Sequence, residues 1–244
     1  MMLLTSLLLA TGPTMTQHPW SLGVAVIHSP SPYKSLSNQN LLIPLVGYEG
    51  RHLYLRGPAA GYYLSRSQAF TLSLAVQLAP SRLNTADARD PQIRQLDDRQ
   101  FSVLGGIKGQ WRSAAGHWSA TLATDITGRH HGQYAELAWD YPLQMPTSAL
   151  QLSPGVGVNY YSPDYARYYF GVSADEAQRS GLALWQPTEA INPFVQLSVR
   201  WRMAQRWQAI ASLRQMWLDS PLKNSPLVSG QSAVSAFAGI SYRF

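Results

Sequence analysis

The residues best suited to chemistry lie in a short polar stretch, where His130 and His131 follow Arg129 and stand close after Asp125. A histidine that takes up a proton beside an orienting carboxylate is the arrangement of a general base. The sequence has no G-x-S-x-G nucleophile motif and no H-E-x-x-H metal motif. We therefore interpret the stretch as the polar tip of an external loop between two strands, and we predict no catalytic residue, no cofactor and no metal ligand.

A second candidate is the adjacent carboxylate pair of Asp97 and Asp98, which could hold a cation. The same segment contains Arg89, Arg94 and Arg99, so its charges nearly balance. This balance favours a solvated, charge-compensated loop over a cation site.

A third set of charged residues recurs at every second position of otherwise apolar segments. The set comprises Lys108, Arg200, Arg214, Arg243, Asp125, Glu136 and Asp140. If the opposite charges pair, they close the interior of a barrel, and if they segregate, a narrow selective channel remains. A closed interior is favoured, because a small barrel has much less room than porins of about 16 to 18 strands.

The segments that carry these charges alternate apolar and polar residues, so that successive side chains point to opposite faces of a strand. They are Trp20–Val26, Phe70–Leu78, Phe101–Trp111, Trp118–Ile126, Tyr134–Tyr141, Gln151–Tyr160, Ile191–Trp201, Trp207–Trp217 and Val234–Phe244. Nearly every charge falls on the polar face, and aromatic residues gather at the segment ends. Both features are typical of a transmembrane β-barrel with aromatic girdles. Phe244 closes the last segment, with Tyr242 two positions before it, as in the assembly signal of outer-membrane barrels.

Composition agrees with a lipid-facing surface. Charged residues make up 13% of the 244 residues, against roughly 25% in soluble domains, and there are 8 Trp and 13 Tyr. Mean hydropathy is only -0.15, and no apolar run reaches the roughly 20 residues of a membrane-spanning helix. The chain has no Cys and hence neither a disulfide nor a thiolate site, and its net charge of +6 is too scattered to predict nucleic-acid binding.

Connections between the segments alternate between short and long. Short ones lie at Gly50, 65–69, 112–116, 142–149 and 203–206, and long ones at 29–40, 80–99, 162–188 and 219–231. Barrels of this kind have short periplasmic turns and longer external loops. Keeping the two classes on opposite sides requires one more reversal near Gly57 and Pro58. The sequence thus predicts an all-β, antiparallel barrel of about twelve strands with both termini periplasmic, and ten strands are the alternative. Pro44, Pro154 and Pro193 fall inside strands, where we expect local bulges.

Residues 1–16 resemble the apolar core of a secretory signal peptide that lacks its basic front end. Residues 17–244 would then form the outer-membrane barrel.

Several segments resemble the MipA/OmpV family of outer-membrane proteins. They are Tyr160–Leu182, Trp217–Val228, Leu122–Leu137, the stretches SPSPYKS and LLIPLVGYEGRHLYLRG of the first hairpin, and the terminal SYRF. His131 and Phe237 depart from the family pattern.

The resemblance implies a barrel without cofactor in the outer membrane of a Gram-negative cell, in contact with lipid and lipopolysaccharide. One family member is a scaffold that joins a murein hydrolase to a murein synthase, and others are porin-like or adhesin-like. We accordingly expect a non-catalytic scaffold for a periplasmic lytic transglycosylase and a penicillin-binding protein. A narrow diffusion channel or an adhesin is the alternative, and a lipid-modifying barrel enzyme is third.

Overall fold

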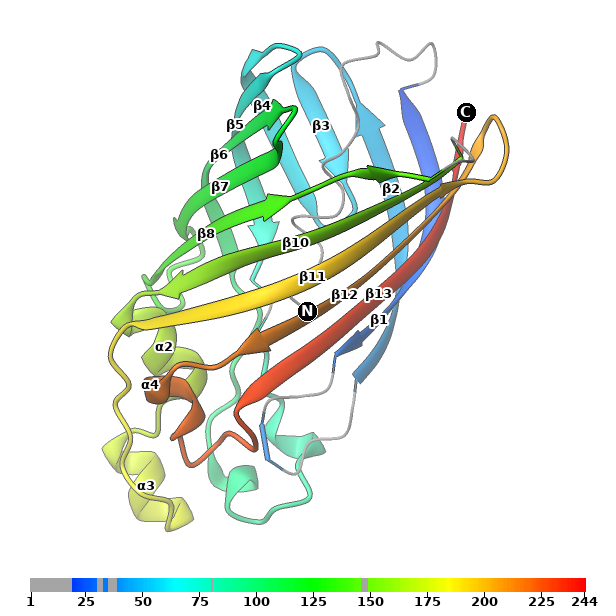
Figure 1. Cartoon of the computed structure of the whole chain (residues 1–244). Helices are drawn as coiled ribbons and strands as arrows, with labels where there is room; N and C mark the ends of the chain where they lie inside the picture. The colour runs from blue at the N-terminus through cyan, green and yellow to red at the C-terminus, as the bar shows by residue number, and fades with distance from the viewer. Residues whose placement is uncertain (1–18, 30–32, 35–38, 80, 146–148) are drawn as a thin grey trace.

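The alternating segments form the strands of a closed antiparallel barrel (Figure 1). The structure is a computed structural model that describes residues 19–29, 33–34, 39–79, 81–145 and 149–244. The predicted signal segment, residues 1–16, lies outside the described residues. The strands are β1 (Trp20–Ser29), β2 (Gln39–Glu49), β3 (Leu53–Arg56), β4 (Ala59–Arg66), β5 (Phe70–Leu78), β6 (Val103–Ser113), β7 (Gly116–Asp125), β8 (Gln133–Asp140), β9 (Leu143–Gln144), β10 (Leu150–Tyr161), β11 (Ala190–Arg202), β12 (Trp207–Trp217) and β13 (Ser232–Arg243).

Pairing between the first and last strands closes the barrel. β13 pairs with β12 on one side and with β1 on the other, where Leu22 faces Tyr242. β9 pairs only with β10, next to the part of β10 that pairs with β8. β8 and β9 therefore occupy one position in the wall, and the described residues form a ring of twelve strands. The reversal expected at Gly57 and Pro58 is the β3–β4 turn, in which Gly57 adopts a φ of 57°. The alternative of ten strands is therefore wrong.

Side chains sort between the two faces as the alternation predicts. Along β5, Leu74 and Val76 are exposed on the outside, whereas Ser73, Ala75 and Gln77 are buried on the inside. Large outward apolar residues of other strands, such as Leu122, Leu197 and Leu213, are likewise exposed. This lipid-facing belt needs no partner within the chain, because the bilayer is its solvent.

The two ends of the barrel differ. At one end, which we call the turn end, the strands join through the short segments 50–52, 67–69, 114–115, 141–149 and 203–206. At the other, the loop end, long segments carry η1 (Thr85–Asp87), η2 (Ile93–Gln95), α2 (Pro163–Phe170), α3 (Ala174–Ser180) and α4 (Ser220–Lys223). Figure 1 shows the labelled helices gathered at the end of the barrel away from the C-terminus. Among the described residues, no helix is long and apolar enough to cross a membrane.

Each of the three prolines within strands lies where the pairing with one of its two neighbouring strands is interrupted. The expectation of β-bulges at these prolines is therefore wrong. Pro44 lies on the edge of β2 beyond Gly47, where the pairing with β3 ends. Pro154 lies at the break between the segments that pair with β8 and β9. Pro193 directly precedes Phe194, the last β11 residue in register with β12. Each proline thus avoids removing a donor from a continuous ladder.

Candidate functional site

A cap of aromatic residues fills the loop end of the lumen. α2 begins after Ser162, whose hydroxyl accepts the Tyr165 amide, and Pro163 suits the first helical turn. The helix buries Tyr165 and Tyr169 completely. The ring of Tyr165 stacks on that of Tyr161 from β10, with centroids 4.6 Å apart, and also contacts the ring of Tyr169 at 4.9 Å. Residues of four loops join this cluster, so the cap is a hydrophobic core of its own.

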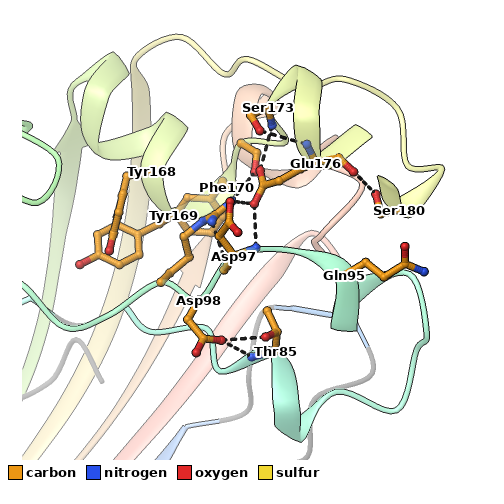
Figure 2. Close-up of polar contacts among 12 residues, drawn as sticks. Thr85, Gln95, Asp97, Asp98, Tyr168, Tyr169, Phe170, Ser173, Glu176 and Ser180 are labelled. Atoms are coloured by element: carbon orange, nitrogen blue, oxygen red, sulfur yellow. Dashed lines mark hydrogen bonds and ion pairs between the residues drawn. The ribbon is translucent and has the colours of Figure 1, made fainter. Parts of the chain in front are cut away.

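The cap is fastened by a buried carboxylate that joins the 162–189 loop to the 79–102 loop. Glu176 completes a capping box with Ser173 at the start of α3 (Figure 2). Its Oε1 accepts the Asp97 amide at 3.0 Å and Arg99 Nη2 at 2.7 Å. Burial opposes ionisation of Glu176, but hydrogen bonds from the Ser173 and Asp97 amides and the charge of Arg99 outweigh it. The pKa of this carboxyl therefore lies below its usual value.

The charges of Asp97 and Asp98 are compensated, as predicted. The compensating groups are mostly not the arginines of the same segment. Asp97 forms an ion pair with Arg179 of α3 at 2.5 Å. Asp98 accepts the amide and the hydroxyl of Thr85, and these hydrogen bonds lower the pKa of its carboxyl (Figure 2). Among the described residues no group of three potential metal ligands occurs.

His130 and Asp125 lie close to the hydroxyl of Ser102, but the hydrogen bonds of the imidazole are not those of a general base acting on that hydroxyl. Ser102 Oγ lies 2.8 Å from His130 Nε2, and His130 Nδ1 accepts the Gly132 amide at 2.9 Å. Burial lowers the pKa of His130, against the opposing effect of Asp125, and so favours the neutral ring. Because Nδ1 accepts an amide hydrogen, the neutral ring carries its proton on Nε2. The imidazole therefore donates to Ser102 and cannot accept its proton.

The carboxylate of Asp125 accepts hydrogen bonds from backbone amides of the loop and does not orient the imidazole of His130. Its Oδ2 accepts the amides of His130 and His131, and its Oδ1 accepts the amide of Thr127. The carboxylate lies 3.9 Å from Nε2 of His130, the same nitrogen that contacts Ser102. Arg129 points away to the Gln100 side-chain oxygen. The 126–132 segment is thus a structured loop tip, as predicted.

A buried ion pair crosses the lumen below the cap. Arg214 of β12 donates to Glu136 of β8 at 2.9 Å and to Gln196 of β11 at 2.8 Å, and its guanidinium lies 3.8 Å from the centroid of Phe194. Because β10 and β11 separate β8 from β12 in the wall, this contact bridges across the interior. Tyr134 also donates to Glu136. The expected pairing of lumen charges is therefore confirmed for Glu136.

Sequence reasoning missed a second ion-pair cluster nearer the turn end. Glu49 of β2 accepts Arg56 Nη2 at 2.8 Å and the Tyr63 hydroxyl at 2.5 Å, and it lies 3.2 Å from Arg66. These residues belong to the short segments around the Gly57 reversal, whose faces were not assigned. Their alternation with Leu53, Leu55 and Tyr62 is the signal that could have placed them on the inner face.

The turn end holds a polar cavity instead of a cap. Its volume is about 50 Å³. It is lined by Gln110, Arg112, His117, Trp118, Ser119, Asp140, Gln151, Ser153, Gln196, Ser198, Val199, Arg200 and Ile210. His117 Nδ1 lies 3.5 Å from Asp140 Oδ2 across the β7–β8 pair. The predicted inner residues Asp140 and Arg200 therefore share one cavity, whereas Asp125 lies at the opposite end.

The closed twelve-stranded barrel, its apolar outer belt and its polar interior define an outer-membrane β-barrel protein. The chain belongs to the family described as MltA-interacting protein MipA, whose model matches residues 22–244. It is 30% identical over 245 residues to the MltA-interacting protein of Escherichia coli, covering 100% of this chain and 98% of that protein. Outer membrane protein OmpV of Vibrio cholerae is 21% identical over 198 residues, which are 81% of this chain and 76% of the relative.

Among solved structures, an outer membrane channel from Pseudomonas putida is similar with a TM-score of 0.46 and 11% sequence identity. The similarity covers 94% of this chain and 97% of that chain.

Proposed function

We propose that this protein is a non-catalytic docking scaffold, which holds a periplasmic murein hydrolase of the lytic transglycosylase class near a penicillin-binding murein synthase. The observation that carries the proposal is the asymmetry of the barrel. Its loop end is filled by a packed aromatic core, whereas its turn end presents short turns and a polar cavity. With the turn end in the periplasm, the accessible part of the protein faces the cell wall.

The name of the Escherichia coli relative supports a lytic transglycosylase as one partner. A scaffold needs a rigid platform more than a reactive group. The cross-lumen contact of Arg214 with Glu136 and the continuous strand pairing supply such rigidity. The neutral, donating His130 supports the absence of a catalytic role, because it leaves Ser102 without a base.

Capture from solubilised envelopes tests the docking function. A tagged chain should retain a murein hydrolase and a synthase above the level retained by an unrelated barrel. Substitution of the exposed turn residues Ala114 and Gln205 by Lys should reduce this capture. The same change at the exposed loop residues Gln178 and Asn224 is the matched control and should leave it intact. Recovery of neither enzyme would count against the scaffold.

A narrow diffusion channel is the second candidate, and the polar inner face is the observation that favours it. Conduction would require the cap around Tyr165 to move aside, since this residue is fully buried in the lumen mouth. Planar-bilayer recording distinguishes the two functions. A scaffold with a closed cap should give no discrete conductance steps, and a channel should give them.

A further inference from the structure

Strand pairing in the barrel wall is interrupted beside β2. This strand pairs with β1 from Gln39 to Tyr48, but with β3 only from Gly47 to Glu49. β3 has four residues, about 13 Å at roughly 3.3 Å each, whereas the apolar belt of such a barrel is roughly 25 Å tall. The β3–β4 hairpin therefore turns back within the membrane (Figure 1). Toward the loop end from this turn, none of the described strands pairs with residues 39–45 on the β3 side.

The exposure of Leu41 and Leu42 indicates that the wall is open at this place, which we call the side opening. The two residues are neighbours in one strand, so their side chains point to opposite faces. Leu41 is paired with Ile27, a buried residue of the inner face. Nevertheless Leu41 is 42% exposed, and Leu42 on the outer face is 70% exposed. On β5, which is paired on both sides, the inward Ala75 is buried.

The inner face beside the side opening is apolar. Leu41 and Ile43 lie on it, and Ile43 packs against a buried cluster. The cluster consists of Ala25, Ile27, Leu45, Ile210 and Phe237. Further along the wall the inner face is polar, as at Ser73 of β5 and Thr121 of β7. An apolar inner surface that is accessible beside the bilayer suits a hydrocarbon chain better than water.

The free edge of β2 is poorly suited to pairing with an added strand, whether from a second copy or from another protein. The Val46 carbonyl accepts the Gly57 amide and so points toward the β3 side. Because backbone groups alternate along a strand, those of Leu42 and Pro44 point to the same side. Pro44 has no amide hydrogen, so an added strand would lack a donor in the middle of the edge. A hydrocarbon chain requires no such donor.

We propose that the side opening admits a hydrocarbon chain of a membrane lipid from the bilayer to the inner face of the barrel, where the chain lies against Leu41 and Ile43. The bilayer supplies such chains at this depth, whereas the aromatic cap fills the loop end of the lumen. The site goes beyond the docking function, because it needs no partner enzyme. Its test can therefore fail while enzyme capture succeeds.

Fluorescence quenching in lipid vesicles tests the site, since the native chain has no Cys and single labels can be placed. Leu41→Cys, Leu42→Cys and Ser198→Cys each receive a small thiol-reactive fluorophore, and the vesicles contain phosphatidylcholine with brominated acyl chains. We expect at least about twofold loss of fluorescence at Leu41→Cys and Leu42→Cys, because both labels contact acyl chains. Ser198→Cys is the matched control and should lose little, because it lies on the inner face of β11, which is paired on both sides.

The other occupants of the side opening give different results. Quenching of the Leu41→Cys label by aqueous iodide but not by bromine would show that water fills the opening. Protection of this label from both quenchers would show that a second copy or another part of the protein covers it. Either result would overturn the proposal.

A charged variant distinguishes entry of the chain from contact at the outer surface. Ile43→Asp places a charge on the inner face and should reduce bromine quenching of the Leu41→Cys label at least about twofold, while quenching at Leu42→Cys stays unchanged. Gln151→Asp adds the same charge to the inner face of β10 and should change neither value. Both variants are checked for heat-modifiable gel mobility as a sign of folding. Unchanged quenching of the Leu41→Cys label in folded Ile43→Asp would show that no chain lies on the inner face.

Discussion

Glu176 is the residue on which the loop cap depends most. Its side chain is 2% exposed and binds Arg99 and the Asp97 amide of another loop. Removing one partner of a buried ion pair costs about 3 to 5 kcal/mol, because the other charge stays buried. Glu176→Ala should therefore destabilise the cap by about 3 kcal/mol locally, measured as faster hydrogen exchange in α3. Arg167→Ala breaks an exposed ion pair with Asp164 and should change the exchange little.

The pKa of the Glu176 carboxyl also predicts how the stability of the cap changes as the pH falls. The pKa of Glu176 is below its ordinary value of 4.5, so the ionised form is favoured in the folded cap. Its stabilising effect is complete above that value and is lost as pH falls through the lowered pKa. Protection factors for hydrogen exchange in α3, which correct for the intrinsic slowing of exchange in acid, should fall on acidification below pH 4.5 in the native chain. Glu176→Gln should show a smaller change over the same range, and an equal change would refute this assignment.

The candidate site could be predicted from sequence only in part, for a reason visible at the residue scale. The His130 segment was correctly interpreted as a loop tip, since no nucleophile motif accompanied it. The hydrogen bond between Ser102 and His130 could not have been predicted, because 28 positions separate the two residues. Only the folded course of the β5–β6 loop brings Ser102 next to the imidazole. Likewise Arg99 was paired with its neighbours in the sequence, whereas Glu176 binds it from a loop 77 positions away.

At the scale of the element, the assignment of lipid and lumen faces makes a quantitative prediction. Leu197 of β11 is 45% exposed on the outer face, and its neighbour Ser198 lines the turn-end cavity. Leu197→Arg should lower the free energy of unfolding by about 2 to 4 kcal/mol, because a charge then faces lipid. Ser198→Arg places the same charge in a polar interior and should cost much less. Urea titrations in lipid vesicles would compare them, and equal costs would contradict the register.

Strand faces and strand number could be predicted because a period of two is a property of the backbone. The local structure at Pro44, Pro154 and Pro193 could not be predicted from the sequence. Each proline lies at a break in strand pairing, and the place of that break depends on how far the neighbouring strand extends. The short β3 ends pairing with β2 at Gly47, and only this length places Pro44 on an edge. The length of a neighbouring strand is a tertiary property that local patterning does not encode.

For the whole molecule, the orientation in the membrane is a prediction that single cysteines can test, because the native chain has none. Cys at the exposed residues Gln178 and Asn224 of the loop end should react with an impermeant reagent on intact cells. Cys at Ala114 and Gln205 of the turn end should react only after the outer membrane is opened. The reverse pattern would place the turn-end cavity outside the cell and remove the basis of the docking proposal.

Assembly of the whole barrel depends on its final strand, which meets the first. The Phe244 amide donates to the Trp20 carbonyl, and its ring lies 5.3 Å from that of Tyr242. Tyr242 in turn contacts Trp207 of β12, so β13 is joined to β12 through these rings and to β1 through the backbone. Burial of one aromatic side chain stabilises by roughly 1.5 to 3 kcal/mol, which a closed barrel can lose and still fold.

Deletion of Phe244 should nevertheless reduce outer-membrane levels strongly, because the terminal aromatic residue is also the expected assembly signal. We expect the truncated chain to accumulate in the periplasm and to be degraded, measured by fractionation and heat-modifiable gel mobility. Trp207→Ala is the matched control, since it removes the β12 ring that contacts Tyr242 and leaves the terminus intact. If both variants reach the outer membrane at native levels, Phe244 contributes only packing. If both fail equally, loss of aromatic packing against Tyr242, and not loss of the terminal residue, limits assembly.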